Sequence, residues 1–152
     1  MSILHSGTQL FRNALLLEAG ANVIGGIGMI AFPASFLGSM IKSSAQVTAL
    51  STTLFQWSGG LAIALAAPLL LGYPNTAFGI ANRYSAYITL GAGEACVLAI
   101  IAGQMMSEDR ALTDTALLSV VALFAPILSL RVWCMAFKPE WVGKLADDKK
   151  AA

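Results

Sequence analysis

The sequence predicts an all-α integral membrane protein, a four-helix bundle with up-down-up-down topology and both termini in the cytosol. Of its 152 residues, 57% are hydrophobic and only 11% are charged, whereas soluble domains carry about a quarter charged residues. A domain of this size cannot hide so much apolar surface from water, so lipid is the expected solvent. The net charge of +1 gives no reason to expect nucleic acid as a partner.

Four segments reach the length of about 20 mostly apolar residues that a membrane-crossing helix needs. The connections between them are short and rich in Gly, Pro, Asn and Ser or in charged residues, which is typical of turns. Short connections make neighbouring helices antiparallel. The expected spans cover residues 11–37, 49–71, 84–103 and 113–137 of a single domain, 1–142, which a polar tail follows at 143–152.

The basic residues predict the orientation. Seven of the nine Lys and Arg residues fall on the side that holds both termini, and only Lys42 and Arg110 fall on the other. An excess of basic residues marks the cytosolic side of a membrane protein. The chain ends in "DDKKAA", so Lys149 and Lys150 resemble the dilysine retrieval signal of the endoplasmic reticulum, an address that a receptor reads from a cytosolic tail.

Two glutamates interrupt apolar runs, Glu18 in "LLLEAGANVIGG" and Glu94 in "LGAGEACVLAII". Ionisable residues inside a membrane are costly, usually face the bundle interior and often mark function. Glu18 and Arg131 lie at similar depths from the cytosolic side, so an ion pair between them is the structural alternative to catalysis. Glu94 is placed near the midplane without a basic residue at its depth, which favours a neutral acid bonded to Asn22 or Tyr87.

The candidate catalytic residues are therefore Glu94 and Glu18. Asn22 follows Glu18 by one turn, and Tyr87 shares a helix face with Gly91 and Glu94. The candidate substrate-binding residues are the polar and aromatic side chains of the four spans, namely Asn22, Gln56, Trp57, Tyr87, Arg131 and Asp114.

Glycines in "GGIGMIAFP" and "SGGLAIALAAP" predict close contact between the first two helices, because small residues let membrane helices approach each other. Cys96 and Cys134 lie in apolar runs and are expected to be free thiols.

The stretches "GMIAFPASFLG" and "WSGGLAIALAAPLLLG", together with the four-helix length, resemble small DoxX-like membrane proteins. The chain is also similar to the sterol isomerase and emopamil-binding group, endoplasmic-reticulum bundles whose acidic residues face an apolar cavity. Fungal membrane-bound terpene cyclases, which protonate an epoxide or alkene with buried carboxylates, are similar in logic but longer. These resemblances imply proton chemistry on a lipophilic substrate.

The sequence leaves several functions open. The first is an enzyme that isomerises or cyclises a terpenoid, sterol or polyketide with carboxylates as general acid and base. No nucleotide loop, redox cysteine pair or metal-ligand spacing is present in the sequence, so no cofactor or metal is expected. The second is a membrane scaffold or lipid-binding subunit, and the third is lipid transport or ion conduction, for which the short helices would form a pore in a homo-oligomer. The expected partners are a lipophilic small molecule and membrane lipid.

Overall fold

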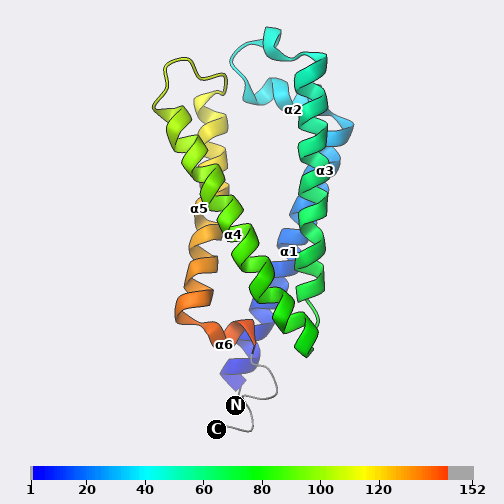
Figure 1. Cartoon of the computed structure of the whole chain (residues 1–152), viewed down its shortest axis with the longest axis vertical. Helices are drawn as coiled ribbons and strands as arrows, with labels where there is room; N and C mark the ends of the chain where they lie inside the picture. The colour runs from blue at the N-terminus through cyan, green and yellow to red at the C-terminus, as the bar shows by residue number, and fades with distance from the viewer. Residues whose placement is uncertain (1, 144–152) are drawn as a thin grey trace.

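The computed structural model describes residues 2–143, and throughout this range the chain is helical apart from short connections (Figure 1). The helices are α1 (Ser2–Ala31), α2 (Pro33–Met40), a 3-10 turn (Ser44–Gln46), α3 (Ala49–Gly72), α4 (Ala77–Met105), α5 (Asp114–Phe137) and α6 (Pro139–Val142). Four of them, α1, α3, α4 and α5, are long and apolar enough to cross a membrane. The predicted all-α membrane bundle is confirmed.

The second and fourth predicted spans agree with α3 and α5 within a residue, but the other two differ. The first was predicted to continue to residue 37, whereas α1 ends at Ala31 and α2 begins at Pro33. Proline lacks the amide hydrogen of a helical residue and disfavours helical backbone in the residue before it. Phe32 accordingly leaves the helical conformation, at φ −129° and ψ 48°.

The helix that carries Glu94 starts at Ala77 and not at residue 84. Thr76 caps it, because its side chain accepts a hydrogen bond from the amide of Gly79 at 3.1 Å. Such caps satisfy amides that have no partner inside the helix. The polar residues Asn82 and Arg83 suggested a loop, but they lie in the second turn of α4.

The four long helices form two pairs, α1 with α3 and α4 with α5 (Figure 1). The two pairs converge at the end of the bundle where α6 lies. α1 packs along α3, and α4 contacts both α3 and α5. At one end α6 closes the bundle, and we call this the α6 end. At the opposite end a short antiparallel bridge joins Ile41 to Leu112, so the loops before α3 and α5 are tied together.

α1 and α3 touch through their backbones at Gly26 and Gly59. A Cβ atom on Gly26 would lie 2.6 Å from the carbonyl oxygen of Gly59, and one on Gly59 would lie 2.7 Å from that of Gly26. Both distances are too short for any side chain, so this crossing requires glycine on both helices. The expectation of close helix contact from the glycine-rich stretches is confirmed.

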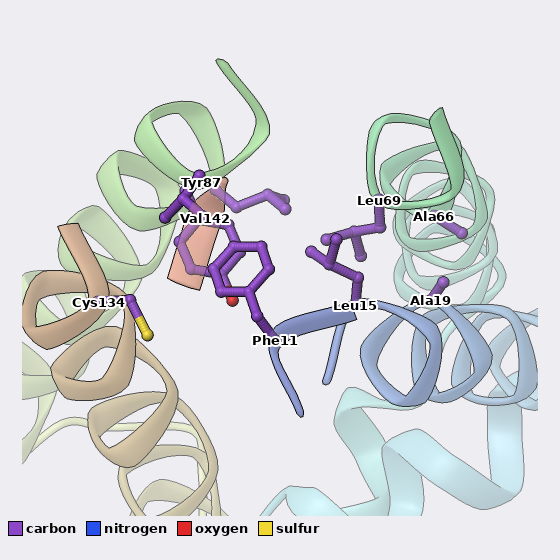
Figure 2. Close-up of a cluster of buried hydrophobic side chains, with 9 residues drawn as sticks. Phe11, Leu15, Ala19, Ala66, Leu69, Tyr87, Cys134 and Val142 are labelled. Carbon is purple, nitrogen blue, oxygen red and sulfur yellow. The ribbon is translucent and has the colours of Figure 1, made fainter. Parts of the chain in front are cut away.

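The buried core lies toward the α6 end (Figure 2). It includes Phe11 and Leu15 of α1, Leu69 of α3, Tyr87 of α4 and Val142 of α6. Large apolar side chains such as Leu17 (78% exposed) point outward instead. Large apolar side chains on the outer surface suit a protein that is surrounded by lipid tails.

Arg83 has no exposed surface and fixes the α6 end. Its guanidinium donates to the carbonyl oxygens of Gly72 at 2.7 Å, Pro74 at 3.1 Å and Val142 at 2.6 Å. Gly72 and Val142 are the last residues of α3 and α6, where helix carbonyls lack partners, and Pro74 follows α3 by two residues. In the count of basic residues Arg83 is only a cation of the second connection, and its sequence position does not predict this role.

Gly59→Ala should destabilise the bundle, whereas Gly60→Ala should not. The two positions are adjacent in α3, but only a Cβ at Gly59 meets atoms of α1, and nothing lies within 4 Å of one at Gly60. Overpacking costs about 1–3 kcal/mol, while alanine is otherwise the better helix former by about 1 kcal/mol. Thermal unfolding in detergent measures both; equal midpoints for the two variants would contradict the backbone crossing.

Candidate functional site

Three charged side chains from three different helices form a cluster inside the bundle. Arg131 of α5 donates from Nε to both carboxylate oxygens of Glu94 on α4, at 3.0 and 2.9 Å. Its Nη2 donates to Oε1 of Glu18 on α1. We call Glu18, Glu94 and Arg131 the charged cluster. The predicted ion pair between Glu18 and Arg131 is confirmed.

The cluster is well shielded within the described residues. The side chain of Arg131 is 3% exposed, that of Glu94 is 7% exposed and that of Glu18 is 18% exposed. The guanidinium carbon of Arg131 also lies 4.6 Å from the centroid of the Tyr87 ring, a cation–π distance. Tyr87 in turn stacks on Phe11, with ring centroids 4.7 Å apart, so the aromatic core supports the cation.

The expectation that Glu94 has no cation at its depth is wrong, because Arg131 contacts both of its oxygens. The depth had been counted from a helix that starts at residue 84, and α4 starts earlier. Figure 1 also shows α4 running obliquely across the bundle, so residue number along it does not translate directly into depth. The partner of Glu94 is therefore Arg131 and neither Asn22 nor Tyr87.

The other candidate binding residues do not join the cluster. Gln56 donates from Nε2 to the carbonyl oxygen of Ile30 at 3.0 Å and so links α3 to α1. Trp57 is 68% exposed on the outer face. Asp114 forms an exposed ion pair with Arg110 at the start of α5. Asn22 is half-buried on α1, one turn beyond Glu18.

A groove of about 490 Å³ adjoins the cluster between α4 and α5. Arg131 and Tyr87 contribute to its lining, and Gly91 leaves space between them. A Cβ atom on Gly91 would meet only Cδ of Arg131 at 3.6 Å and Leu128 at 3.7 Å. The remaining lining residues are apolar: Ile88, Leu128, Val132, Met135 and Ala136.

Helical spacing predicts Gly91 on the face of Glu94, but the α5 residues that line the groove were not predicted. Leu128, Val132 and Met135 flank Arg131 at spacings of three and four residues, so they share its helix face. This spacing predicts that the three residues line the bundle interior only if Arg131 is assumed to face the interior. The apolar character of α5 on every side gave no reason to single them out.

Among the described residues, no group of three or more His, Cys, Asp and Glu side chains is placed to hold a metal ion. Cys96 is exposed and Cys134 is buried, and both are free thiols, as the sequence predicted. The cluster and the adjoining Tyr87 present carboxylates, a guanidinium and a phenol.

Comparison of the chain with protein-family models, with curated proteins and with solved structures found no match.

Arg131→Met should destabilise the protein by about 3–5 kcal/mol, because it leaves the buried Glu94 and the partly buried Glu18 without their cation. Adding Glu18→Gln should recover part of this loss. The measurement is a double-mutant cycle of unfolding in detergent. Asp114→Asn is the matched control, since it breaks an exposed ion pair and should cost about 0–1 kcal/mol. Purely additive losses in the cycle would count against coupling between Glu18 and Arg131.

Proposed function

We propose that this protein is an integral-membrane enzyme that isomerises or cyclises a lipophilic small molecule of the terpenoid, sterol or polyketide class. The catalysis is general acid–base chemistry by Glu94 and Glu18 without a cofactor. The observation that carries the proposal is the placement of two carboxylates, Glu94 buried and Glu18 partly buried, on one guanidinium that itself lines an apolar groove. Ligand sites commonly pair an apolar lining with a few converging polar groups.

The charge count of the cluster supports proton transfer. Two ionised carboxylates and one guanidinium sum to −1, and a single added proton makes the cluster neutral. An uncompensated charge is unfavourable in a membrane interior, so the proposed mechanism places one transferable proton on the cluster.

The proposed reaction needs only these groups. A protonated carboxyl donates its proton to an alkene, epoxide or carbonyl of the substrate, and Arg131 then stabilises the carboxylate that remains. A second carboxylate removes a proton from a neighbouring carbon of the cationic intermediate, which restores the starting charge of the site. Gly91, one turn before Glu94 on the same face, lines the groove beside Arg131.

Glu94→Gln should lower product formation by about 10²–10⁴-fold, the usual contribution of a general acid or base. Glutamine keeps the shape of the side chain but cannot exchange a proton usefully. The test expresses the full chain in a host without related activity, supplies terpenoid, sterol and polyketide precursors, and profiles the products. Glu108→Gln, an exposed loop position, is the matched control. Wild-type product formation by Glu94→Gln would refute the proposal.

A membrane scaffold or lipid-binding subunit is the second candidate. The observation that favours it is that the charged cluster joins α1, α4 and α5, which gives each charged side chain a structural purpose. In that case the carboxylate variants should change thermal stability, and the product profile should be the same with and without the protein.

The membrane we propose is that of the endoplasmic reticulum, with both termini in the cytosol. Its support is the excess of basic residues on one side of the predicted topology and the dilysine pattern of Lys149 and Lys150, which lie outside the described residues. Changing both lysines to serine should move the protein toward the Golgi, as fluorescence microscopy measures. Unchanged localisation would remove the retrieval signal, and a protease-protected tail in sealed microsomes would reverse the orientation.

A further inference from the structure

Two arginines at the α6 end donate to the same atom. Arg12 of α1 donates from Nε to the carbonyl oxygen of Tyr73 at 2.8 Å. Arg83 of α4 donates from Nη2 to the same oxygen at 3.3 Å. We call Arg12 and Arg83 the arginine pair. It shares no residue with the charged cluster.

The partners of the arginine pair are neutral. Nη1 of Arg12 donates to Oε1 of Gln9 at 3.0 Å, and its guanidinium carbon lies 4.4 Å from the centroid of the Tyr73 ring. Arg83 donates to backbone carbonyl oxygens of three residues besides Tyr73. Neither arginine forms an ion pair within the described residues. Because neighbouring like charges repel, the two cations at this end require a counter-charge.

The acids closest in sequence to this end do not supply it. Glu140, the acid of α6, lies 3.7 Å from the ammonium of Lys138. The tail at 144–152, outside the described residues, contains three lysines and two aspartates, so it brings no net negative charge. An anion from outside the chain is therefore the expected counter-charge.

The member of the pair that an anion can reach is Arg12. Arg83 has no exposed surface, whereas Arg12 is only partly buried. Nη2 of Arg12 has no hydrogen-bond partner among the described residues. It differs from Nη1 of Arg131, which also lacks a partner but is enclosed by protein. Nη2 of Arg12 is thus an accessible charged donor whose guanidinium is already held in place.

The position of the pair indicates which anion it meets. Tyr73 directly follows α3, and α4 begins at Ala77. Both helices are long and apolar enough to span a membrane, and the turn between them lies at the α6 end (Figure 1). Trp141 of α6 packs edge to face on Trp133, with ring centroids 5.0 Å apart, and tryptophan is enriched at membrane–water boundaries. The anion found at this depth is the phosphate of a lipid head group, which guanidinium groups bind well.

We propose that Arg12, with Arg83 behind it, binds the head group of an anionic phospholipid at the α6 end. The charge of Arg83 adds to the attraction and distinguishes this site from an isolated surface arginine. The proposed topology puts the lipid in the cytosolic leaflet, where anionic lipids are abundant. The site is separate from the proposed catalysis and does not depend on it.

The test is native mass spectrometry of the full chain in detergent, titrated with phosphatidylglycerol or with phosphatidylcholine of the same acyl chains. The wild type should bind the first phosphatidylglycerol at least about fivefold more tightly than phosphatidylcholine, the usual contribution of one basic residue near an anionic head group. This comparison needs no variant and decides the proposal even if a variant fails to fold.

Arg12→Gln should remove the preference for phosphatidylglycerol. The fold should persist, because Arg83 still donates to the Tyr73 carbonyl oxygen. Lys42→Gln is the matched control, since it removes one exposed positive charge near the opposite end of the bundle, and it should keep the preference.

Four outcomes would overturn the proposal. The first is equal binding of the two lipids by the wild type, and the second is an equal loss of preference in Lys42→Gln and Arg12→Gln. The third is displacement of the lipid by an equal concentration of glycerol phosphate, which would assign the site to a soluble phosphate. The fourth is a gain in phosphatidylglycerol affinity from Asp147→Asn with Asp148→Asn that Arg12→Gln abolishes, which would assign the site to the tail.

Discussion

The contact between Arg131 and its two carboxylates is the constraint around which the rest of the bundle is arranged. A lone guanidinium in a low-dielectric interior is costly, and so is a lone carboxylate. Arg131 meets Glu18 and Glu94 from two other helices, and the Tyr87 ring covers its face. These contacts have narrow geometric tolerance, so they fix the relative positions of α1, α4 and α5 far more tightly than apolar contacts between the same helices would.

Different kinds of contact hold the other parts together. α1 and α3 rely on backbone approach at Gly26 and Gly59, which needs no polar group. The α6 end relies on Arg83, whose donors reach carbonyls from two separate helix ends. Between lipid-facing helices, the transfer of apolar surface out of water gives no driving force. The bundle therefore combines close packing in one helix pair with polar contacts where three or more helices meet.

How far the sequence predicts the structure differs from element to element. Hydropathy and length predicted α3 and α5 closely, because both are bounded by clear turn residues. The start of α4 was missed because the buried role of Arg83 depends on carbonyls that only the folded chain brings together. The Glu18–Arg131 pair was predictable because counting residues along each helix places both side chains at a similar depth from the predicted cytosolic side. Glu94 could not be paired in this way, since counting ignores helix tilt and the reach of an arginine.

The order of synthesis gives the charged cluster a further consequence. The ribosome makes α1 and α4 before α5, so Glu18 and Glu94 both enter the membrane ahead of Arg131, the cation that compensates them within the described residues. Each unpaired charge costs about 2.5–3.5 kcal/mol at the centre of a membrane helix. A nascent or truncated chain without α5 thus carries two acids in its membrane helices without the cation that pairs with both of them in the folded bundle.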